Sequence, residues 1–132
     1  MTRRRISSGA TTETALSYSR ALVVPDAGGD WVFVSGSTGV DYTTMTLADG
    51  VEAQCRRTLA NIAAALDEAG ASVADVVRVT YYVIDRAEFA ACAPLMRDAL
   101  AGSMPAATML VVAGLLDPAM RIEIEVTARR PV

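Results

Sequence analysis

Histidine and lysine are both absent from this chain of 132 residues, and all twelve basic residues are arginines. Without histidine, neither a Ser-His-Asp nor a Cys-His catalytic arrangement is possible, and the commonest zinc ligand is missing. Without lysine, Schiff-base catalysis by a lysine amine is excluded as well. A proton carrier in this protein must therefore be a carboxyl group, a tyrosine, a cysteine or water.

Cysteine is scarce, with only Cys55 and Cys92 in the whole chain. They lie far apart and carry no partner motif, which argues against a disulfide framework. Both stand in apolar stretches with helical spacing, so we expect small buried residues rather than reactive thiolates, which need a cationic neighbour.

Positive charge is also scarce, because the net charge is −3 and the pI is about 4.8. The basic residues Arg3–Arg5 and Arg129–Arg130 stand at the two ends and are expected to be solvated, so a nucleic-acid partner is not expected. No apolar run reaches the roughly 18 residues of a membrane span. The basic N-terminus lacks a following apolar region, so no secretory signal is expected and a cytoplasmic protein is the default.

Apolar residues make up 52% of the composition, which is enough for a core, and the length fits one domain over residues 1–132. The stripe Val51, Cys55, Leu59, Ile62 and Leu66 predicts a helix, and Gly70 ends it. A second helix is expected over about 86–100, capped by Asp85 and containing Pro94. Strands are expected at 3–7, 17–24, 31–36, 76–84, 107–112 and 120–128, with a loop over 37–46.

This order, β-β-β-α-β-α-β-β, predicts an α+β fold with two helices on one face of the sheet. Strands that are neighbours in sequence are expected to pair antiparallel. Tyr81, Val83, Met109 and Val111 add more apolar strand surface than two helices can cover. Such a sheet face predicts self-association.

The most distinctive motif is Pro105-Ala106-Ala107-Thr108, with Glu123 following seventeen residues after Ala106. Other pieces stand in a consistent order before and after it, namely Tyr18-Ser19, Val34-Ser35-Gly36, Gln54, Leu59, Asn61, Ala69-Gly70, Asp75-Val76-Val77, Asp85 with Phe89, and Ile122-Glu123-Ile124-Glu125. Together, from about residue 18 to residue 128, they resemble the Rid family, the RidA/YjgF-type reactive-intermediate deaminases that are also described as L-PSP endoribonuclease-like.

The resemblance implies a chorismate-mutase-like fold that assembles as a homotrimer around a central barrel, with clefts between subunits. It implies hydrolysis of reactive imines or enamines, which are small-molecule metabolites, with release of ammonia. It implies no cofactor and no metal.

The resemblance also assigns roles to residues. Glu123 matches a glutamate that orients or activates water, although a strand glutamate paired with Arg121 is the alternative. Tyr18 and Ser35 match pocket residues, although a half-buried strand tyrosine and a turn-capping serine are equally plausible from the sequence. Thr108 is placed to hydrogen-bond a substrate, and Met109 follows it at the cleft.

The chain departs from the family pattern at three positions. Ala107 replaces the arginine that grips a substrate carboxylate, Ala93 stands at the position of an asparagine, and Met109 stands where some members have cysteine. Loss of the guanidinium fork removes on the order of several kcal/mol of binding in a desolvated pocket. We therefore expect a bulkier or less charged ligand than the usual 2-imino acids. Arg20 or Arg121 could replace the arginine, or both could be surface residues.

The sequence therefore predicts a Rid-family enzyme that hydrolyses or deaminates a reactive metabolite. One alternative is a non-catalytic trimer that binds or senses a small ligand. A weaker one is an endoribonuclease or translation inhibitor, since the chain lacks the histidine and lysine that phosphodiester cleavage would use for acid/base work and charge neutralisation.

Overall fold

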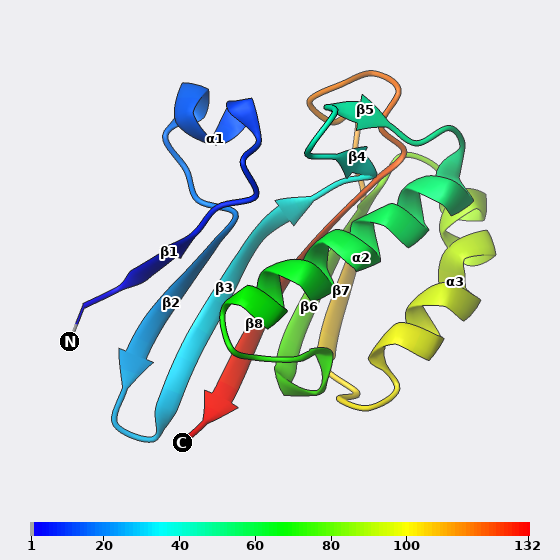
Figure 1. Ribbon diagram of the computed structural model, residues 1–132. Coiled ribbons are helices and arrows are strands. Elements are labelled where there is room, and N and C mark those ends of the chain that lie inside the picture. Colours follow the sequence, from blue (N-terminus) through cyan, green and yellow to red (C-terminus); the bar gives the residue numbers. More distant parts are fainter. Residues whose placement is uncertain (1) are drawn as a thin grey trace.

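The computed structural model describes residues 2–132. The chain forms a six-stranded sheet with two long helices on one face (Figure 1). The sheet strands are β1 Arg4–Ile6, β2 Ala21–Asp26, β3 Gly29–Ser37, β6 Val76–Val83, β7 Ala106–Val111 and β8 Ile122–Pro131. They lie in the order β1-β2-β3-β8-β6-β7. The remaining elements are α1 Thr11–Leu16, β4 Val40–Asp41, β5 Thr46–Leu47, α2 Val51–Glu68, the 3-10 turn Val73–Asp75 and α3 Arg86–Leu100.

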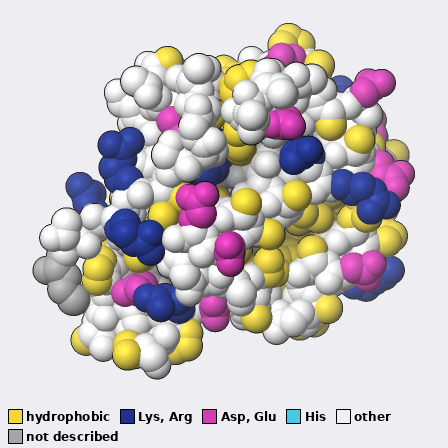
Figure 2. Space-filling model, in the orientation of Figure 1, with side chains coloured by type: hydrophobic (Ala, Val, Ile, Leu, Met, Phe, Trp, Pro, Cys, Tyr) yellow, Lys and Arg dark blue, Asp and Glu magenta, His cyan; other side chains and the backbone are white. Residues whose placement is uncertain are grey.

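The two long helices form where the apolar periodicity predicts them. Asp85 caps α3, because its carboxylate accepts hydrogen bonds from the amides of Ala87 and Glu88 at 2.7 and 3.2 Å. Pro94 lies inside α3 without ending it. Acidic and basic side chains are interspersed over the helix-bearing side of the molecule (Figure 2).

Strand β8 shows how the sheet divides its side chains between two faces. Ile122 and Ile124 are fully buried beneath the helices, while Glu123 and Glu125 between them are half-buried on the opposite face. That opposite face is not covered by the helices, and Phe33 and Leu110 on it are 44% and 46% exposed. The period-2 pattern thus determines that Glu123 points away from the core.

The N-terminal part of the chain differs from the sequence expectation. A short helix, α1, precedes β2, and Ser17 closes it in the left-handed conformation with φ 58°. Strand β2 consequently begins at Ala21, and the expectation that Tyr18 stands in a strand is wrong. The predicted loop 37–46 also contains β4 and the first residue of β5, which pair with each other.

The expectation that sequence-adjacent strands pair antiparallel is wrong for β6 and β7, which are parallel. Helix α3 runs back along the sheet between them, and such a crossover returns the chain in its original direction. Strand β7 lies at one edge of the sheet.

Strand β8 begins after Arg121, and the side chain of Arg121 reaches α3.

Both cysteines are buried and free, as predicted. Burial raises the pKa of Cys55 to about 12, so this thiol stays protonated and packs as a small apolar side chain. None of the helices formed by residues 2–132 is long and apolar enough to cross a membrane.

Candidate functional site

A cavity of about 470 Å³ opens beside the end of β3 and the start of β8. Helix α1, the segment before β2, the β4–β5 region and the loop before β8 all contribute to its wall. The lining residues are Thr12, Leu16, Tyr18, Arg20, Ser35, Gly36, Thr38, Val40, Tyr42, Met45, Leu116, Met120, Glu123 and Glu125. The cavity thus brings together three residues that the sequence singled out, namely Tyr18, Ser35 and Glu123.

The side chain of Glu123 reaches this cavity because the residue beside it on β3 is Gly36, which has no side chain. A Cβ atom at Gly36 would lie 2.0 Å from Oε2 of Glu123 and 2.9 Å from its Cδ, so any other residue at this position would force the Glu123 carboxyl to move. Burial raises the pKa of Glu123, the negative charge of Glu125 raises it further, and the positive charge of Arg20 opposes both. A carboxyl group of this kind exchanges protons nearer to neutral pH than an ordinary glutamate.

Arg20 is the cation of the cavity and is only 3% exposed. Its Nη1 donates to the carbonyl oxygen of Gly36 at 2.8 Å, and its Nη2 donates to the hydroxyl of Tyr18 at 3.2 Å. Its Cζ atom lies 4.5 Å from the ring centroid of Tyr42. Of the two arginines considered as replacements for the missing one, the structure places Arg20 in the cavity.

The hydroxyl groups of Tyr18 and Ser35 are in different situations. The Tyr18 hydroxyl lies 2.9 Å from Oγ1 of Thr12 and accepts from Arg20, so it belongs to the polar wall of the cavity. The Ser35 hydroxyl donates to the carbonyl oxygen of Ser19 at 2.5 Å. Ser35 therefore lines the cavity while its proton holds two segments of backbone together.

The motif on β7 does not reach this cavity within one chain. Thr108 accepts a hydrogen bond from Arg78 at 2.9 Å on the face away from the helices. Ala107 instead lines a hollow of about 230 Å³ beneath α3, and Met109 is 37% exposed at the sheet edge. Ala93 lies on the exposed side of α3. The predicted site residues thus fall into two groups, of which one chain assembles only the group around Glu123.

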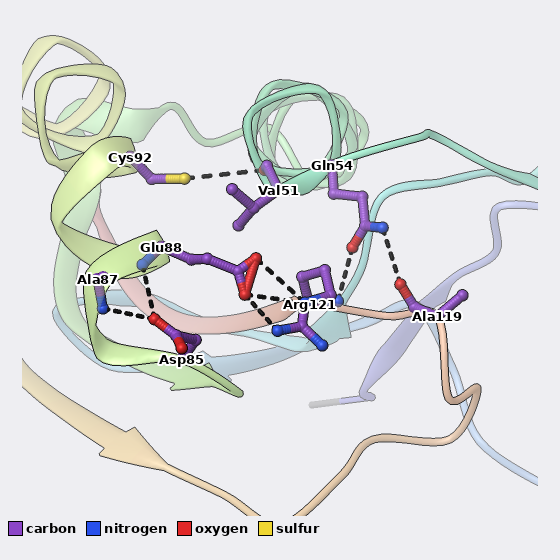
Figure 3. A network of polar contacts seen from close by, with 8 residues as sticks. All are labelled: Val51, Gln54, Asp85, Ala87, Glu88, Cys92, Ala119 and Arg121. Carbon is purple, nitrogen blue, oxygen red and sulfur yellow. Dashed lines mark hydrogen bonds and ion pairs between the residues drawn. The ribbon is translucent and has the colours of Figure 1, made fainter.

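Arg121 does not line the cavity, and its guanidinium group contacts Glu88 instead (Figure 3). Its Nε donates to Oε1 and Oε2 of Glu88 at 2.9 and 3.1 Å, so it is not a free cation for the cavity. Beside it, the buried side chain of Gln54 accepts from the Arg121 amide at 2.7 Å and donates to the carbonyl oxygen of Ala119 at 3.0 Å (Figure 3). It also donates to the carbonyl oxygen of Ala48 at 3.1 Å. This amide fastens the loop that carries Leu116 and Met120 to α2.

The sequence reasoning missed three parts of the site, namely helix α1, the ring of Tyr42 and the contact between Gly36 and Glu123. Gly36 stood in a recognised motif, but a glycine in sequence does not reveal which side chain lies against it. Tyr42 stood in a segment without periodicity. Within residues 2–132, no three histidine, cysteine or acidic side chains are grouped as metal ligands.

Comparison with known proteins places the chain in a family. The family model described as Endoribonuclease L-PSP matches residues 9–130. A RutC family protein of Pyrococcus abyssi is 36% identical over 99 residues, 74% of this chain and 75% of the relative. A protein of Capra hircus named 2-iminobutanoate/2-iminopropanoate deaminase is 32% identical over 127 residues, 95% of this chain and 89% of the relative.

Solved structures agree with this placement. A member of the highly conserved YjgF/YER057c/UK114 family from Mycobacterium tuberculosis superimposes with a TM-score of 0.84 at 35% identity, covering 97% of this chain and 99% of the other. The YjgF gene product of E. coli gives a TM-score of 0.79 at 29% identity, covering 96% and 98%. The protein therefore belongs to the Rid/YjgF family, and its α+β fold is the fold of that family.

Proposed function

We propose that this protein hydrolyses a reactive imine or enamine in the cavity beside Glu123. The observation that carries the proposal is the half-buried carboxyl of Glu123, whose pKa is raised, in a cavity with a cation and a tyrosine hydroxyl. Relatives that carry the name 2-iminobutanoate/2-iminopropanoate deaminase support it. The Glu123 carboxylate would accept a proton from water as the oxygen attacks the imine carbon.

The balance of the reaction is simple. The new C–O bond forms while the imine nitrogen takes up a proton, which yields a carbinolamine. Proton transfer from oxygen to nitrogen then breaks the C–N bond, ammonia leaves and a carbonyl compound remains. An enamine reacts by the same route after tautomerising to its imine. The overall step consumes one water and needs no oxidant or reductant.

The cleft is proposed to be complete only in a homotrimer. Strand β7 is an edge strand whose residues Met109, Leu110 and Val111 are exposed, and Ala107 and Thr108 stand on the same strand away from Glu123. A neighbouring copy could bring its own β7 to the cavity. Ala107 would then leave that wall without a charge, which favours a substrate other than the usual 2-imino acids. We further expect a single domain working in the cytoplasm.

The test measures ammonia release from two kinds of freshly generated imine, those that carry a carboxylate group and those that do not. The wild type should release ammonia, and Glu123→Ala should lower the rate about 100-fold or more. Glu52→Ala is the matched control, because Glu52 is an exposed carboxylate that pairs with Arg56 one turn away on α2. If Glu123→Ala keeps full activity, Glu123 is not the catalytic group. If only Ala107→Arg acts on 2-imino acids, these are not the substrates of the natural chain.

A non-catalytic ligand-binding trimer is the second candidate, and the specific observation in its favour is Ala107, which removes the family's charged grip. A thermal-shift screen of metabolites separates the two functions. Ligands that raise Tm and are recovered unchanged after long incubation would support binding alone. Ribonuclease activity is the weaker alternative, and RNA left intact by highly purified, metal-free protein would dismiss it.

A further inference from the structure

Arg20 is a buried cation in the wall of the cavity, and neither of the two acidic residues of that wall, Glu123 and Glu125, forms an ion pair with it. Among residues 2–132, no carboxylate oxygen lies within ion-pair distance of Arg20, although its positive charge favours the ionised forms of both Glu13 and Glu123. Glu13 is also buried, at 4% exposure, but it does not line this cavity. Its Oε2 accepts from the amide of Ser8 at 3.0 Å, and its Oε1 is buried without a hydrogen-bond partner among residues 2–132. Burying an unpaired charge costs several kcal/mol, so a ligand that supplies the anion gains that interaction.

The guanidinium group also has hydrogen-bond donors that no side chain or backbone group of residues 2–132 uses. Nη1 donates to the backbone carbonyl groups of Ser35 and Gly36, which fixes the plane of the guanidinium group. Nε is buried and has no hydrogen-bond partner within residues 2–132. Nη2 has two hydrogens and donates only to Tyr18. The Nε–Nη2 edge is one on which arginine takes a carboxylate with two parallel hydrogen bonds. Arg20 and Tyr42 also line a smaller cavity of about 190 Å³.

The rest of the wall is largely apolar and aromatic. Leu16, Met45, Leu116 and Met120 line the same cavity, and the ring of Tyr42 stacks on the guanidinium group. Such a wall suits a ligand body without charge. A ligand that fits all of these groups is amphipathic, with an anionic head and an apolar body.

We infer that Arg20 is the specificity-determining residue of the cavity and binds the anionic group of such a ligand, in place of a cation on β7. This assignment rests on the proposed function for the role of Glu123, and it places the reacting carbon between the anion at Arg20 and the carboxyl of Glu123. The anionic group therefore lies on the β2 side of the cavity, whereas a carboxylate-binding residue at position 107 would hold it from the β7 side.

The test uses a pair of probes of one shape, phenylacetate and its neutral amide phenylacetamide, and measures binding by calorimetry. The wild type should bind phenylacetate roughly tenfold or more tightly than the amide, which corresponds to about 1.4 kcal/mol. In Arg20→Gln this preference should vanish, whereas Arg56→Gln should keep it, because Arg56 is exposed on α2 and pairs with Glu52 one turn away. Arg20→Lys keeps the charge without the fork and should retain part of the preference.

A second measurement covers the case in which Arg20→Gln does not fold. In the wild-type protein, titration with phenylacetate should shift the Nε–Hε resonance of Arg20, and phenylacetamide should leave it in place. Equal affinity for both probes, an unmoved Arg20 resonance, or a preference that survives in folded Arg20→Gln would each overturn the inference. None of these readouts requires ammonia release, so a protein that binds but does not hydrolyse fails the proposed function alone.

Discussion

At the scale of single residues, the contact between Gly36 and Glu123 decides what the cavity can do. Any Cβ atom at position 36 would overlap the Glu123 carboxyl, as its 2.0 Å distance to Oε2 shows. We expect Gly36→Ala to turn the carboxyl out of the cavity and to lower Glu123-dependent ammonia release about 100-fold. The free energy of unfolding should change by less than about 1 kcal/mol, because the end of a flexible side chain can move.

Gly102→Ala is the matched control for this prediction. No atom lies within 4 Å of a Cβ placed at Gly102, so the same substitution there meets open space. Activity and the denaturant midpoint of unfolding should both stay at the wild-type values. A Gly36→Ala variant with full activity would contradict the positioning of Glu123 by β3.

Glu123 should also make stability depend on pH in a characteristic direction. Because burial raises its pKa in the folded protein, the folded state holds this proton more tightly than the unfolded chain does. Its contribution to stability is therefore complete below the ordinary value of 4.5 and is lost as the pH rises through the raised pKa. We expect Glu123→Gln to have a higher Tm than the wild type at pH 7, with the difference shrinking toward pH 4.

Thermal unfolding of the two proteins across this pH range measures the effect. Subtracting one curve from the other isolates Glu123 from the remaining carboxylates, whose contributions are common to both. A Glu123→Gln variant that is less stable at neutral pH would show that the carboxylate makes favourable contacts in the folded state.

At the scale of elements, the loop before β8 depends on one helix residue. Gln54 is 2% exposed and hydrogen-bonds the backbone groups of Ala119 and Arg121 (Figure 3), and also that of Ala48. Gln54→Leu removes these three part-buried hydrogen bonds, and each contributes about 1 kcal/mol. We expect a loss of about 3 kcal/mol or more in denaturant unfolding, together with weaker ligand binding, because Leu116 and Met120 lose their support.

Arg56→Gln on the same helix provides the comparison. Arg56 is exposed and forms an ion pair with Glu52 one turn away, so the change should stay within about 0.5 kcal/mol. Equal stability of the two variants would mean that the loop does not depend on Gln54.

Elements with a strong local pattern were predicted well from the sequence. The stripe of α2, the capped start of α3 and the alternation of β8 each depend on residues a few positions apart. Helix α1 was missed because it spans only Thr11–Leu16 and no side chain caps its N-terminus. The parallel pairing of β6 with β7 was missed because pairing is decided by where α3 returns the chain, and no residue in either strand encodes that.

At the scale of the whole molecule, the open sheet face and the edge strand β7 leave apolar surface exposed. We expect the protein to elute with three times its chain mass of 13.9 kDa in size-exclusion chromatography with light scattering. Leu110→Glu places a charge on β7, where the side chain is 46% exposed, and should shift the mass to that of one chain. Ammonia release should fall with it, since the cleft would lose its second wall.

Ala63→Glu introduces the same side chain on the exposed surface of α2 and should leave the mass unchanged. A wild-type protein that elutes as a single chain would refute the proposed trimer.

The sequence by itself determined the family, the two long helices and the direction in which Glu123 points, because each depends on spacing along the chain. It also excluded histidine and lysine chemistry outright. Only the tertiary structure decided that Arg20 is buried in the same cavity as Glu123, that Arg121 is held by Glu88, and that Gly36 makes room for the carboxyl. These outcomes depend on which distant segments lie side by side, and burial and charge then determine the chemistry of each side chain.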